Sequence, residues 1–260
     1  MKKVLALVTI LALGTAAGAT VTPAQTSDPA VLAEQIQSMT IEAAAAGDDE
    51  ALLEAVALAE RGVTVHPGDA LLHHYHGYAL YRLAARHACD EEADPRCVWD
   101  LLERAESALE ASAEREPMAE THALLASVYG LMIGESPSLG ASLGSRIDGL
   151  QSDALAMGPE NPRVWLLKGI GDFYTPEAYG GGAEPALAAL ERSARAFETD
   201  VPVPPRPRWG RADVHVWLGQ VRHAKGDTDE ARRHYARALE LEPSNAWVRD
   251  HLLPALDAAD

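Results

Sequence analysis

The chain has 260 residues, of which 47% are hydrophobic, so it is long enough to bury a sizeable core. Alanine supplies much of this apolar content and there are only two phenylalanines, a balance that disfavours β-sheets, whose strands prefer β-branched and aromatic residues. The formal net charge of −17 repels nucleic acid and anionic lipid headgroups, so the composition predicts an all-α protein with no nucleic-acid partner.

Residues 1–19 have the organisation of a secretory signal peptide. Two lysines precede the apolar run Val4–Leu13, and small residues at 17–19 follow it. The run is too short for a comfortable membrane span, and no later stretch approaches the length that a span needs, so we expect the mature protein not to cross a membrane. No cysteine near the cleavage site offers a lipid anchor. The sequence therefore predicts a periplasmic or secreted protein that begins with a disordered leader over 20–28.

A pair of helices is predicted directly after the leader. The first, over 29–46, begins with a proline that follows an N-cap aspartate, and it ends before Gly47. The second, over 49–65, ends before Pro67. Together they form a helical hairpin over 29–67.

Three further helix pairs are predicted between residues 70 and 200, and each carries an interruption. The pair over 70–117 is interrupted at 86–98, the pair over 120–159 by a Ser/Gly-rich stretch at 136–144, and the pair over 162–200 by an expanded turn at 174–182. The stretch that follows, 201–209, has four prolines and must therefore be extended or polyproline II.

Cys89 and Cys97 are the two cysteines of the chain, and both lie in the first interruption. In an oxidising compartment two cysteines this close in sequence are expected to form a disulfide, with free thiols or a metal pair as the alternatives. A disulfide would contribute about 2–3 kcal/mol for so short a loop. The stapled insertion would stand out at one edge of the molecule, where it could contact a partner.

The stretch 212–245 has the most regular pattern in the chain. With Ala212 at position 1 of a 34-residue unit, the diagnostic residues are Leu218 and Gly219 at 7 and 8, Gly226 and Asp227 at 15 and 16, Ala231 at 20, Tyr235 at 24, Ala238 at 27 and Pro243 at 32. This spacing resembles a tetratricopeptide repeat (TPR). Gly219 would let two antiparallel helices approach closely, and Pro243 would end the second helix.

The four earlier helix pairs follow a looser version of the same pattern. The resemblance therefore covers nearly all of residues 29–260, and it implies a single domain: a right-handed solenoid of antiparallel helix pairs with about four to five repeats and a capping helix over 246–258. The segment from Asn161 to Gly182 resembles a subgroup of exported bacterial repeat proteins. A fainter, local likeness is to the periplasmic T-component of TRAP transporters, which also has a Gly-Gly turn before a repeat helix.

The resemblance also implies a concave groove, lined by positions 2, 5, 9, 12 and 13 of the first helix of each repeat. Transferred to this chain, the candidate groove residues are His74, Tyr78, Tyr81, Arg82, Leu124, Val128, Leu131, Arg163, Leu166, Ile170, Phe173, Tyr174, Gln220 and His223. An apolar lining with a few polar points suits an extended peptide, an amphipathic helix or a partly apolar ligand. The alternative is that the ends and inserts of the solenoid cover this face and make it core.

The expanded turn ends in the sequence Tyr179, Gly180, Gly181, Gly182. It lacks the Lys-Ser/Thr of a phosphate-binding loop and follows no predicted strand, so phosphate binding is disfavoured. Two interpretations remain: a flexible turn that opens the next helix near Glu184, or a loop that contacts a partner.

Histidines at 73, 74 and 76 form the one cluster that suggests a metal. His73 and His76 lie three residues apart and could share a helix face, but the repeat register favours packing positions and neutral histidines. No His-Glu-x-x-His motif occurs. Residues 140–144 read Gly-x-Ser-x-Gly, but no predicted strand leads into them, as the nucleophile elbow of a hydrolase requires. We therefore expect no enzymatic activity, no metal and no cofactor.

The sequence leads to the hypothesis of an exported, non-catalytic interaction module or scaffold. It would bind a protein or peptide partner through the groove and the inserts. The alternative hypothesis is a periplasmic ligand-binding accessory of a transporter, which predicts a closed apolar cavity instead of an open groove.

Overall fold

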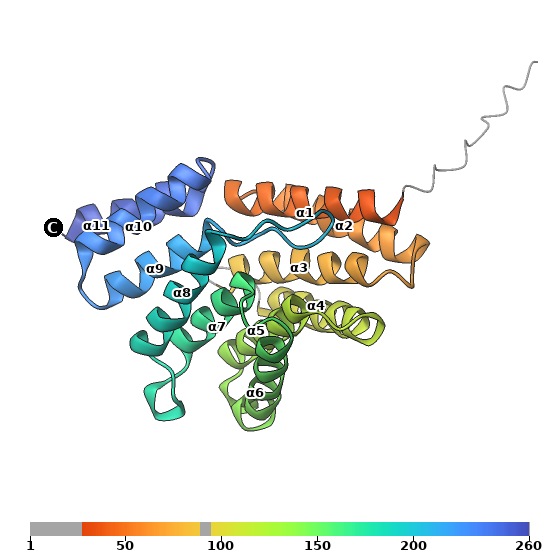
Figure 1. The fold of residues 1–260 in the computed structure, drawn as a ribbon, viewed down its shortest axis with the longest axis horizontal. Coiled ribbons are helices and arrows are strands. Elements are labelled where there is room, and N and C mark those ends of the chain that lie inside the picture. The colour runs from red at the N-terminus through yellow and green to blue at the C-terminus, as the bar shows by residue number, and fades with distance from the viewer. Residues whose placement is uncertain (1–27, 89–94, 260) are drawn as a thin grey trace, which may run out of the picture.

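A computed structural model describes residues 28–88 and 95–259 of the chain, and these ranges are helical without any β-strand (Figure 1). The α-helices are α1 (Pro29–Ala46), α2 (Asp49–Val65), α3 (Ala70–His87), α4 (Pro95–Arg115), α5 (Ala119–Glu135), α6 (Gly140–Met157), α7 (Pro162–Tyr174), α8 (Ala183–Phe197), α9 (Asp213–Ala224), α10 (Thr228–Leu241) and α11 (Leu253–Ala259). Short 3-10 turns, η1 (Pro137–Leu139) and η2 (Glu177–Tyr179), and a π-helical turn, η3 (Val248–Leu252), complete the described elements. The all-α prediction is confirmed.

Side-chain caps determine where several helices begin. Asp28, Asp48 and Asp69 accept hydrogen bonds from backbone N–H groups in the first turns of α1, α2 and α3, at 2.9, 3.0 and 2.9 Å. Asn161 does the same for α7 at 3.0 Å. Each such cap contributes about 1 kcal/mol, and α1 and α2 span the same residues as the helices expected from the sequence.

Small residues bring the two helices of a pair into contact. A Cβ atom added at Gly219 of α9 would lie 2.3 Å from the Tyr235 ring of α10. The equivalent glycines of α3 and α7 face a leucine of α4 and α8 in the same way, at 2.5 and 2.6 Å. These close approaches occur at positions 8 and 24 of the repeat register, so the register inferred from the sequence matches the packing.

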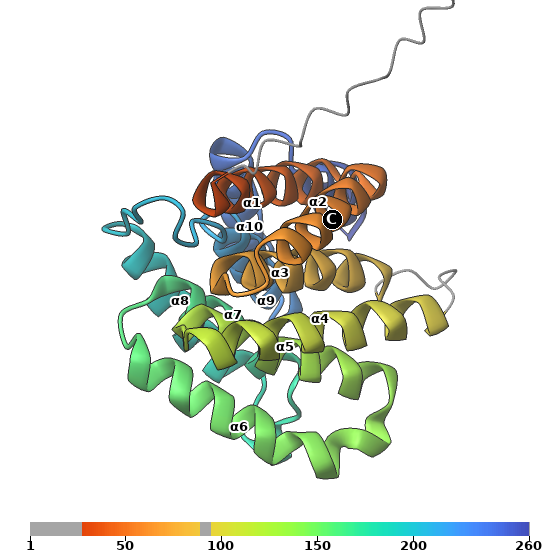
Figure 2. The same cartoon turned by 90° about the vertical axis from the view of Figure 1, so that its right-hand side faces the viewer.

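Five helix pairs, α1/α2, α3/α4, α5/α6, α7/α8 and α9/α10, stack in chain order, and the first helix of each later pair packs against both helices of the pair before it. Figures 1 and 2 show the chain curling so that the end of α10 and the loop after it come close to α1. A Cβ added at Gly47, at the end of α1, would lie 3.6 Å from the Cβ of Ala246. The two ends of the stack therefore meet, and the first helices of the pairs enclose the concave face.

The extent of the insert at 136–144 was predicted wrongly. The interruption shrinks to Ser136 and the 3-10 turn, and α6 starts at Gly140. Glycine costs about 1 kcal/mol in a helix interior, but Leu143, Ile147 and Leu150 of this segment pack on the core. Burial of these side chains offsets the poor helix propensity.

The other predictions concern the two ends of the chain, the cysteines and membrane spans. The cap over 246–258 is interrupted by the π-helical turn η3 before α11 begins. Signal peptide and leader lie outside the described residues, apart from Asp28, and so does the Cys89–Cys97 pairing, because Cys89 is not described. Cys97 is exposed near the start of α4. Within the described ranges, no helix has the length and apolarity needed to cross a membrane.

Candidate functional site on the concave face

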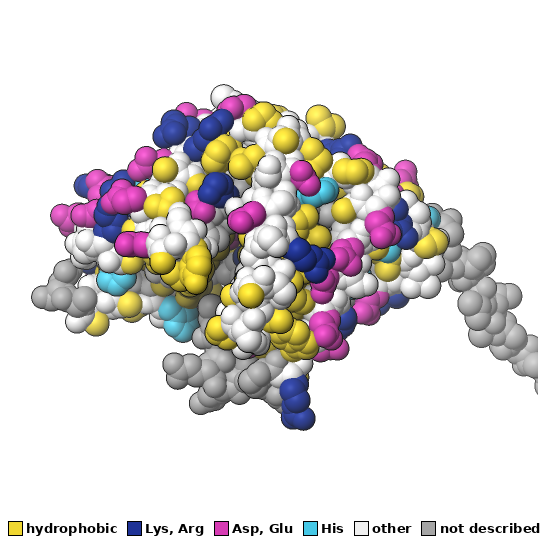
Figure 3. All heavy atoms as spheres, turned by 90° about the horizontal axis from the view of Figure 1, so that it is seen from below, with side chains coloured by type: hydrophobic (Ala, Val, Ile, Leu, Met, Phe, Trp, Pro, Cys, Tyr) yellow, Lys and Arg dark blue, Asp and Glu magenta, His cyan; other side chains and the backbone are white. Residues whose placement is uncertain are grey.

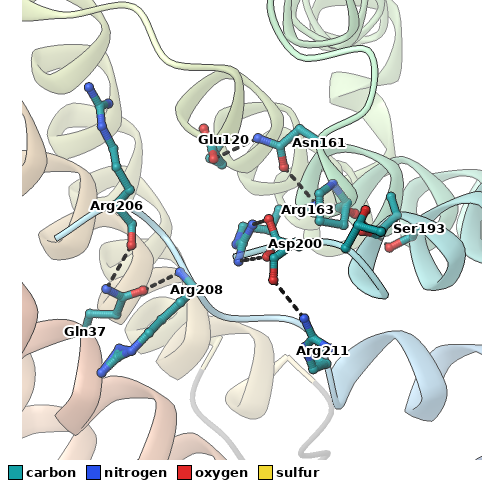
Figure 4. A network of polar contacts seen from close by, with 12 residues as sticks. Gln37, Glu120, Asn161, Arg163, Ser193, Asp200, Arg206, Arg208 and Arg211 are labelled. Atoms are coloured by element: carbon teal, nitrogen blue, oxygen red, sulfur yellow. Dashed lines mark hydrogen bonds and ion pairs between the residues drawn. The ribbon is translucent and has the colours of Figure 1, made fainter. Parts of the chain in front are cut away.

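A segment of the chain itself lies across the concave face. Residues 198–212, here called the crossing segment, connect α8 to α9 without regular secondary structure. The hydroxyl of Tyr75 in α3 donates to the Pro205 carbonyl. Gln37 of α1 donates to the Arg206 carbonyl at 3.5 Å and accepts from the Arg208 N–H at 2.6 Å (Figure 4). The segment thus docks through its backbone, as a bound peptide does.

A buried ion pair holds the start of the crossing segment. The guanidinium of Arg163, 2% exposed, donates to both carboxylate oxygens of Asp200 at 3.3 and 2.7 Å (Figure 4). Arg211 donates to the Asp200 carbonyl at 2.9 Å. Because a buried charge is costly without its partner, this pair orders the segment where it leaves α8.

An aromatic stack holds the other end of the crossing segment. Trp209 and Tyr78 of α3 are both buried, and their rings stack with centroids 5.0 Å apart and an interplanar angle of 15°. Gly210 follows with φ +101°, and a Cβ there would lie 2.9 Å from Leu166. Only glycine combines this backbone conformation with this close approach.

The crossing segment and the helix packing bury part of the groove lining inferred from the sequence. The buried members are His74, Tyr78, Leu124, Val128, Arg163 and Leu166. His74 shares a hydrogen bond of 2.9 Å with Thr121, and burial, reinforced by Arg163 and Arg206, lowers its pKa to about 3. This part of the concave face is therefore covered by the chain itself, as the alternative prediction stated, and these side chains belong to the core.

The part of the concave face that the crossing segment leaves uncovered forms a cleft of about 250 Å³. We call it the aromatic cleft. Its walls come from the second half of α3, from α7, from the start of α9 and from the residues before η3; the lining includes Tyr81, Arg82, Leu166, Ile170, Asp213, Trp217, Asn245 and Trp247. Trp209 of the crossing segment closes one side. The covered and open parts of the face are therefore contiguous.

Two residues of this lining, Trp217 and Trp247, belong to a cluster of four aromatic rings that adjoins the cleft. Trp217 makes edge contacts with Phe173, Tyr174 and Trp247, at centroid distances of 6.5, 5.8 and 5.9 Å. Tyr174 is 64% exposed and Trp247 is 36% exposed. Large exposed aromatics at the rim of a concavity are typical of binding surfaces.

The charged groups of the aromatic cleft are paired. Arg82 binds Asp213 at 3.2 Å and the Tyr78 hydroxyl at 3.1 Å, and Arg86 pairs with Asp49. Burial raises the pKa of Glu242, beside this network, to about 7; Asp213 adds to the rise and Arg82 opposes it. A cleft whose arginines already have carboxylate partners favours an apolar or neutral occupant over an anion.

The other candidate residues lie apart from the cleft walls. Leu131 is half-buried in α5, Gln220 accepts a hydrogen bond from Tyr235 at 2.9 Å, and His223 is exposed at the end of α9. The sequence missed Trp209, Trp217 and Trp247, which are not at the transferred groove positions. A search for aromatics on the first helix of the last repeat and just after its end would have found Trp217 and Trp247.

The turn at 174–182 is tightly packed, contrary to the interpretation as a flexible turn. Gly182 donates to the Asp172 carbonyl at 2.8 Å, and a Cβ at Gly181 would lie 2.1 Å from the Thr175 carbonyl oxygen. Gly180 has φ +85° and ends η2. Tyr179 projects from this turn and is 83% exposed.

The histidines near position 74 do not converge on one point. His73 bonds the Pro67 carbonyl at 3.0 Å, whereas His76 faces Glu60 at 3.9 Å. Across residues 28–88 and 95–259, no group of three or more His, Cys, Asp or Glu side chains is arranged to hold a metal. The face seen in Figure 3 mixes both signs of charge with hydrophobic side chains and has no broad basic patch.

Comparisons with known proteins agree with the repeat architecture. Residues 212–245 match the family model of the tetratricopeptide repeat. A thermophilic TPR protein from Thermus thermophilus superposes with a TM-score of 0.58 at 20% identity, over 89% of this chain and 98% of that one. The HusA haemophore from Porphyromonas gingivalis superposes with a TM-score of 0.57 at 21% identity, over 78% of this chain and 96% of that one. At these identities the likeness concerns the fold, and no curated protein matches the sequence.

Proposed function

We propose that this chain, a protein of the tetratricopeptide-repeat type, is an exported, non-catalytic scaffold that binds an extended segment of a partner protein in its aromatic cleft. Helical-repeat proteins of this type are generally interaction scaffolds. Export rests on the signal-peptide organisation of residues 1–19. The binding site is argued from the concave face.

The observation that carries the proposal is the crossing segment itself. One part of the concave face already binds a proline-rich stretch of polypeptide, which turns at 203–206, through a hydrogen bond from the Tyr75 hydroxyl to the Pro205 carbonyl and a ring stack on Tyr78. The aromatic cleft continues this surface beyond Trp209. A partner segment that enters the cleft would therefore meet the same kind of surface.

The lining also indicates what the partner segment carries. The rings of Tyr81, Trp217 and Trp247 offer contact area for a proline, aromatic or aliphatic side chain. Arg82 and Arg86 are paired with carboxylates, so a strongly acidic peptide gains little. We expect a largely neutral segment whose apolar side chain fills the cleft.

A closed apolar cavity, which the transporter-accessory hypothesis requires, is not favoured. The described residues leave a cleft with exposed aromatics at its rim. The similarity to a haemophore rests on 21% identity and offers no residue-level support for ligand capture.

Selection from a displayed library of random linear peptides tests the proposal. The wild-type chain should enrich neutral peptides with proline or aromatic residues. The rim variants Trp247→Glu and Tyr174→Glu change an exposed ring of the cleft lining and an exposed ring that contacts the lining residue Trp217. Each should weaken binding of the selected peptides by about tenfold or more, which corresponds to about 1.4 kcal/mol.

Tyr179→Glu is the matched control, because Tyr179 is an exposed tyrosine outside the cleft lining. This variant should bind the selected peptides as the wild type does. Equal binding by the rim variants, or failure of the wild type to enrich any peptide, would argue against the cleft as the binding site.

A further inference from the structure

Two histidines face each other on the last helix pair, away from the concave face. His215 lies in α9 and His234 in α10, nineteen residues apart. Their Nδ1 atoms are 3.3 Å apart. The ring centroids are farther apart, at 5.6 Å, with an interplanar angle of 26°. The rings therefore meet edge to edge, nitrogen to nitrogen, instead of stacking face on face.

This geometry requires the two nitrogens to share one proton. In a neutral imidazole one nitrogen donates and the other accepts, so an Nδ1–H of one ring can donate to the bare Nδ1 of the other. Both histidines are half-buried. Burial is the largest cause that lowers both pKa values, that of His215 to about 4, and both rings are therefore neutral near pH 7.

A neutral imidazole pair with facing nitrogens is also the arrangement that chelates a transition metal. Zinc binds histidine nitrogen at about 2.0–2.1 Å in tetrahedral geometry, which places two nitrogen ligands about 3.3 Å apart. The separation of the two Nδ1 atoms is 3.3 Å. The centroid distance of 5.6 Å places the two Nδ1 lone pairs nearly on one line, so both rings must turn about their side-chain bonds for the lone pairs to converge on an ion. The nitrogen separation already fits, so α9 and α10 need not move relative to each other.

We propose that His215 and His234 form a two-histidine site for a divalent transition metal of the Zn²⁺, Ni²⁺ or Cu²⁺ class. Imidazole suits these ions, whereas Mg²⁺ and Ca²⁺ require oxygen ligands. Because both rings are only half-buried, water can complete the coordination. When the metal binds, the proton of the donor ring moves from Nδ1 to Nε2 of the same ring through solvent, so both imidazoles stay neutral and no net proton is released. The ion then joins the two helices of the last repeat.

The charged surroundings of the pair are mixed. Three carboxylates favour a positive charge on the two rings: Glu240 acts on His215, and Glu191 and Glu230 act on His234. The opposing cations are Arg237 near His215, and Arg222 and Arg233 near His234. Arg222 and Arg233 themselves pair with Glu191 and Glu230. Their charges are therefore largely neutralised, and a divalent ion is not repelled.

Calorimetric titration of the untagged, metal-depleted full chain with ZnCl₂ and with NiCl₂ near pH 7.5 tests the proposal. One equivalent should bind with a Kd of about 10 µM or tighter. His215→Ala and His234→Ala should each weaken binding by about tenfold or more. His251→Ala, which changes an exposed histidine near the C-terminal end, should leave the affinity unchanged.

A spectroscopic readout separates this site from other histidines. In long-range ¹H–¹⁵N spectra, zinc should shift the imidazole nitrogens of His215 and His234 together at one equivalent. Far-UV circular dichroism verifies that each variant remains folded. The proposal is overturned if the wild type binds more weakly than about 100 µM, if either alanine variant binds as the wild type does, or if the shifts appear at other histidines.

Discussion

Trp209 joins the covered and the open parts of the concave face. Its indole is 3% exposed and stacks on Tyr78, and its Nε1 has no hydrogen-bond partner among the described residues. The ring therefore contributes apolar contact area and no polar contact. An aromatic replacement without the N–H should keep most of this contribution.

We predict that Trp209→Ala lowers the free energy of unfolding by about 3–5 kcal/mol, because it leaves a cavity against Tyr78. Trp209→Phe should cost much less. Chemical denaturation followed by circular dichroism measures both. Similar losses for Ala and Phe would show that the stack does not anchor the segment.

Glu242 makes the stability of the protein depend on pH. Its pKa of about 7 in the folded state exceeds the ordinary value of 4.5, so the folded chain retains a proton that the unfolded chain has released. The stability contribution is fully present below about pH 4.5 and is lost as the pH rises through 7.

We predict that Glu242→Gln flattens this dependence. Between about pH 5 and about pH 8, the free energy of unfolding of the wild type should fall relative to the variant by roughly 1–3 kcal/mol. Denaturant titrations at the two pH values provide the comparison. Parallel pH profiles for the two proteins would contradict the assignment.

At the scale of elements, helices could be predicted from the sequence, whereas the path of the crossing segment could not. A helix cap such as Asp48 depends on residues close by in sequence, so α1 and α2 were predictable. The contact of Gly219 with Tyr235 depends on the spacing of the repeat, so the register of the last repeat was predictable as well. The prolines of 201–209 predicted an extended or polyproline II stretch, but the chain makes a turn at 203–206, closed by a 3.0 Å hydrogen bond from the Arg206 N–H to the Val203 carbonyl. Nothing local indicated that it would cross α1 and α3, because its contacts with Gln37 and Tyr75 span more than a hundred residues.

The same long-range contacts explain why the groove was predicted only in part. The groove positions transferred from a generic repeat line an open groove only if no other part of the chain covers the concave face. Tyr81, Arg82 and Ile170 do line the cleft, whereas Arg163 is taken up by Asp200 of the crossing segment. Trp247 reaches the cleft only because the ends of the stack meet, which no repeat position encodes.

The anchor of the crossing segment gives a prediction at this scale. Asp200→Asn leaves the Arg163 guanidinium buried without its counter-charge and should lower the free energy of unfolding by about 3–5 kcal/mol. Proteolytic cleavage within 201–209 should accelerate. Replacing both partners, Arg163→Met with Asp200→Leu, should restore much of the stability.

Arg233→Ala is the control for this pair, because Arg233 and Glu230 form an ion pair on the surface. Such pairs contribute about 1 kcal/mol or less. If Asp200→Asn proved as mild as Arg233→Ala, the Arg163–Asp200 pair would not be the anchor.

For the whole molecule, curvature creates the proposed binding site. The aromatic cleft combines residues from α3, α7, α9 and the segment before η3, and these elements meet because the stack curls until Ala246 approaches Gly47. The crossing segment covers another part of the concave face, over Gln37, Tyr75 and Tyr78. The central claim is therefore that a partner segment binds beside the crossing segment and does not replace it.

Photo-cross-linking with a peptide selected by display, carrying one photoreactive residue in place of its apolar side chain, tests this claim most directly. Mass spectrometry identifies the residues that become attached. We predict attachment at Tyr81, Trp217 or Trp247, with cleavage in the crossing segment by protease unchanged while the peptide is bound. Attachment on the outer helices α2, α4 or α6, or faster cleavage within 201–209 on peptide binding, would contradict the account.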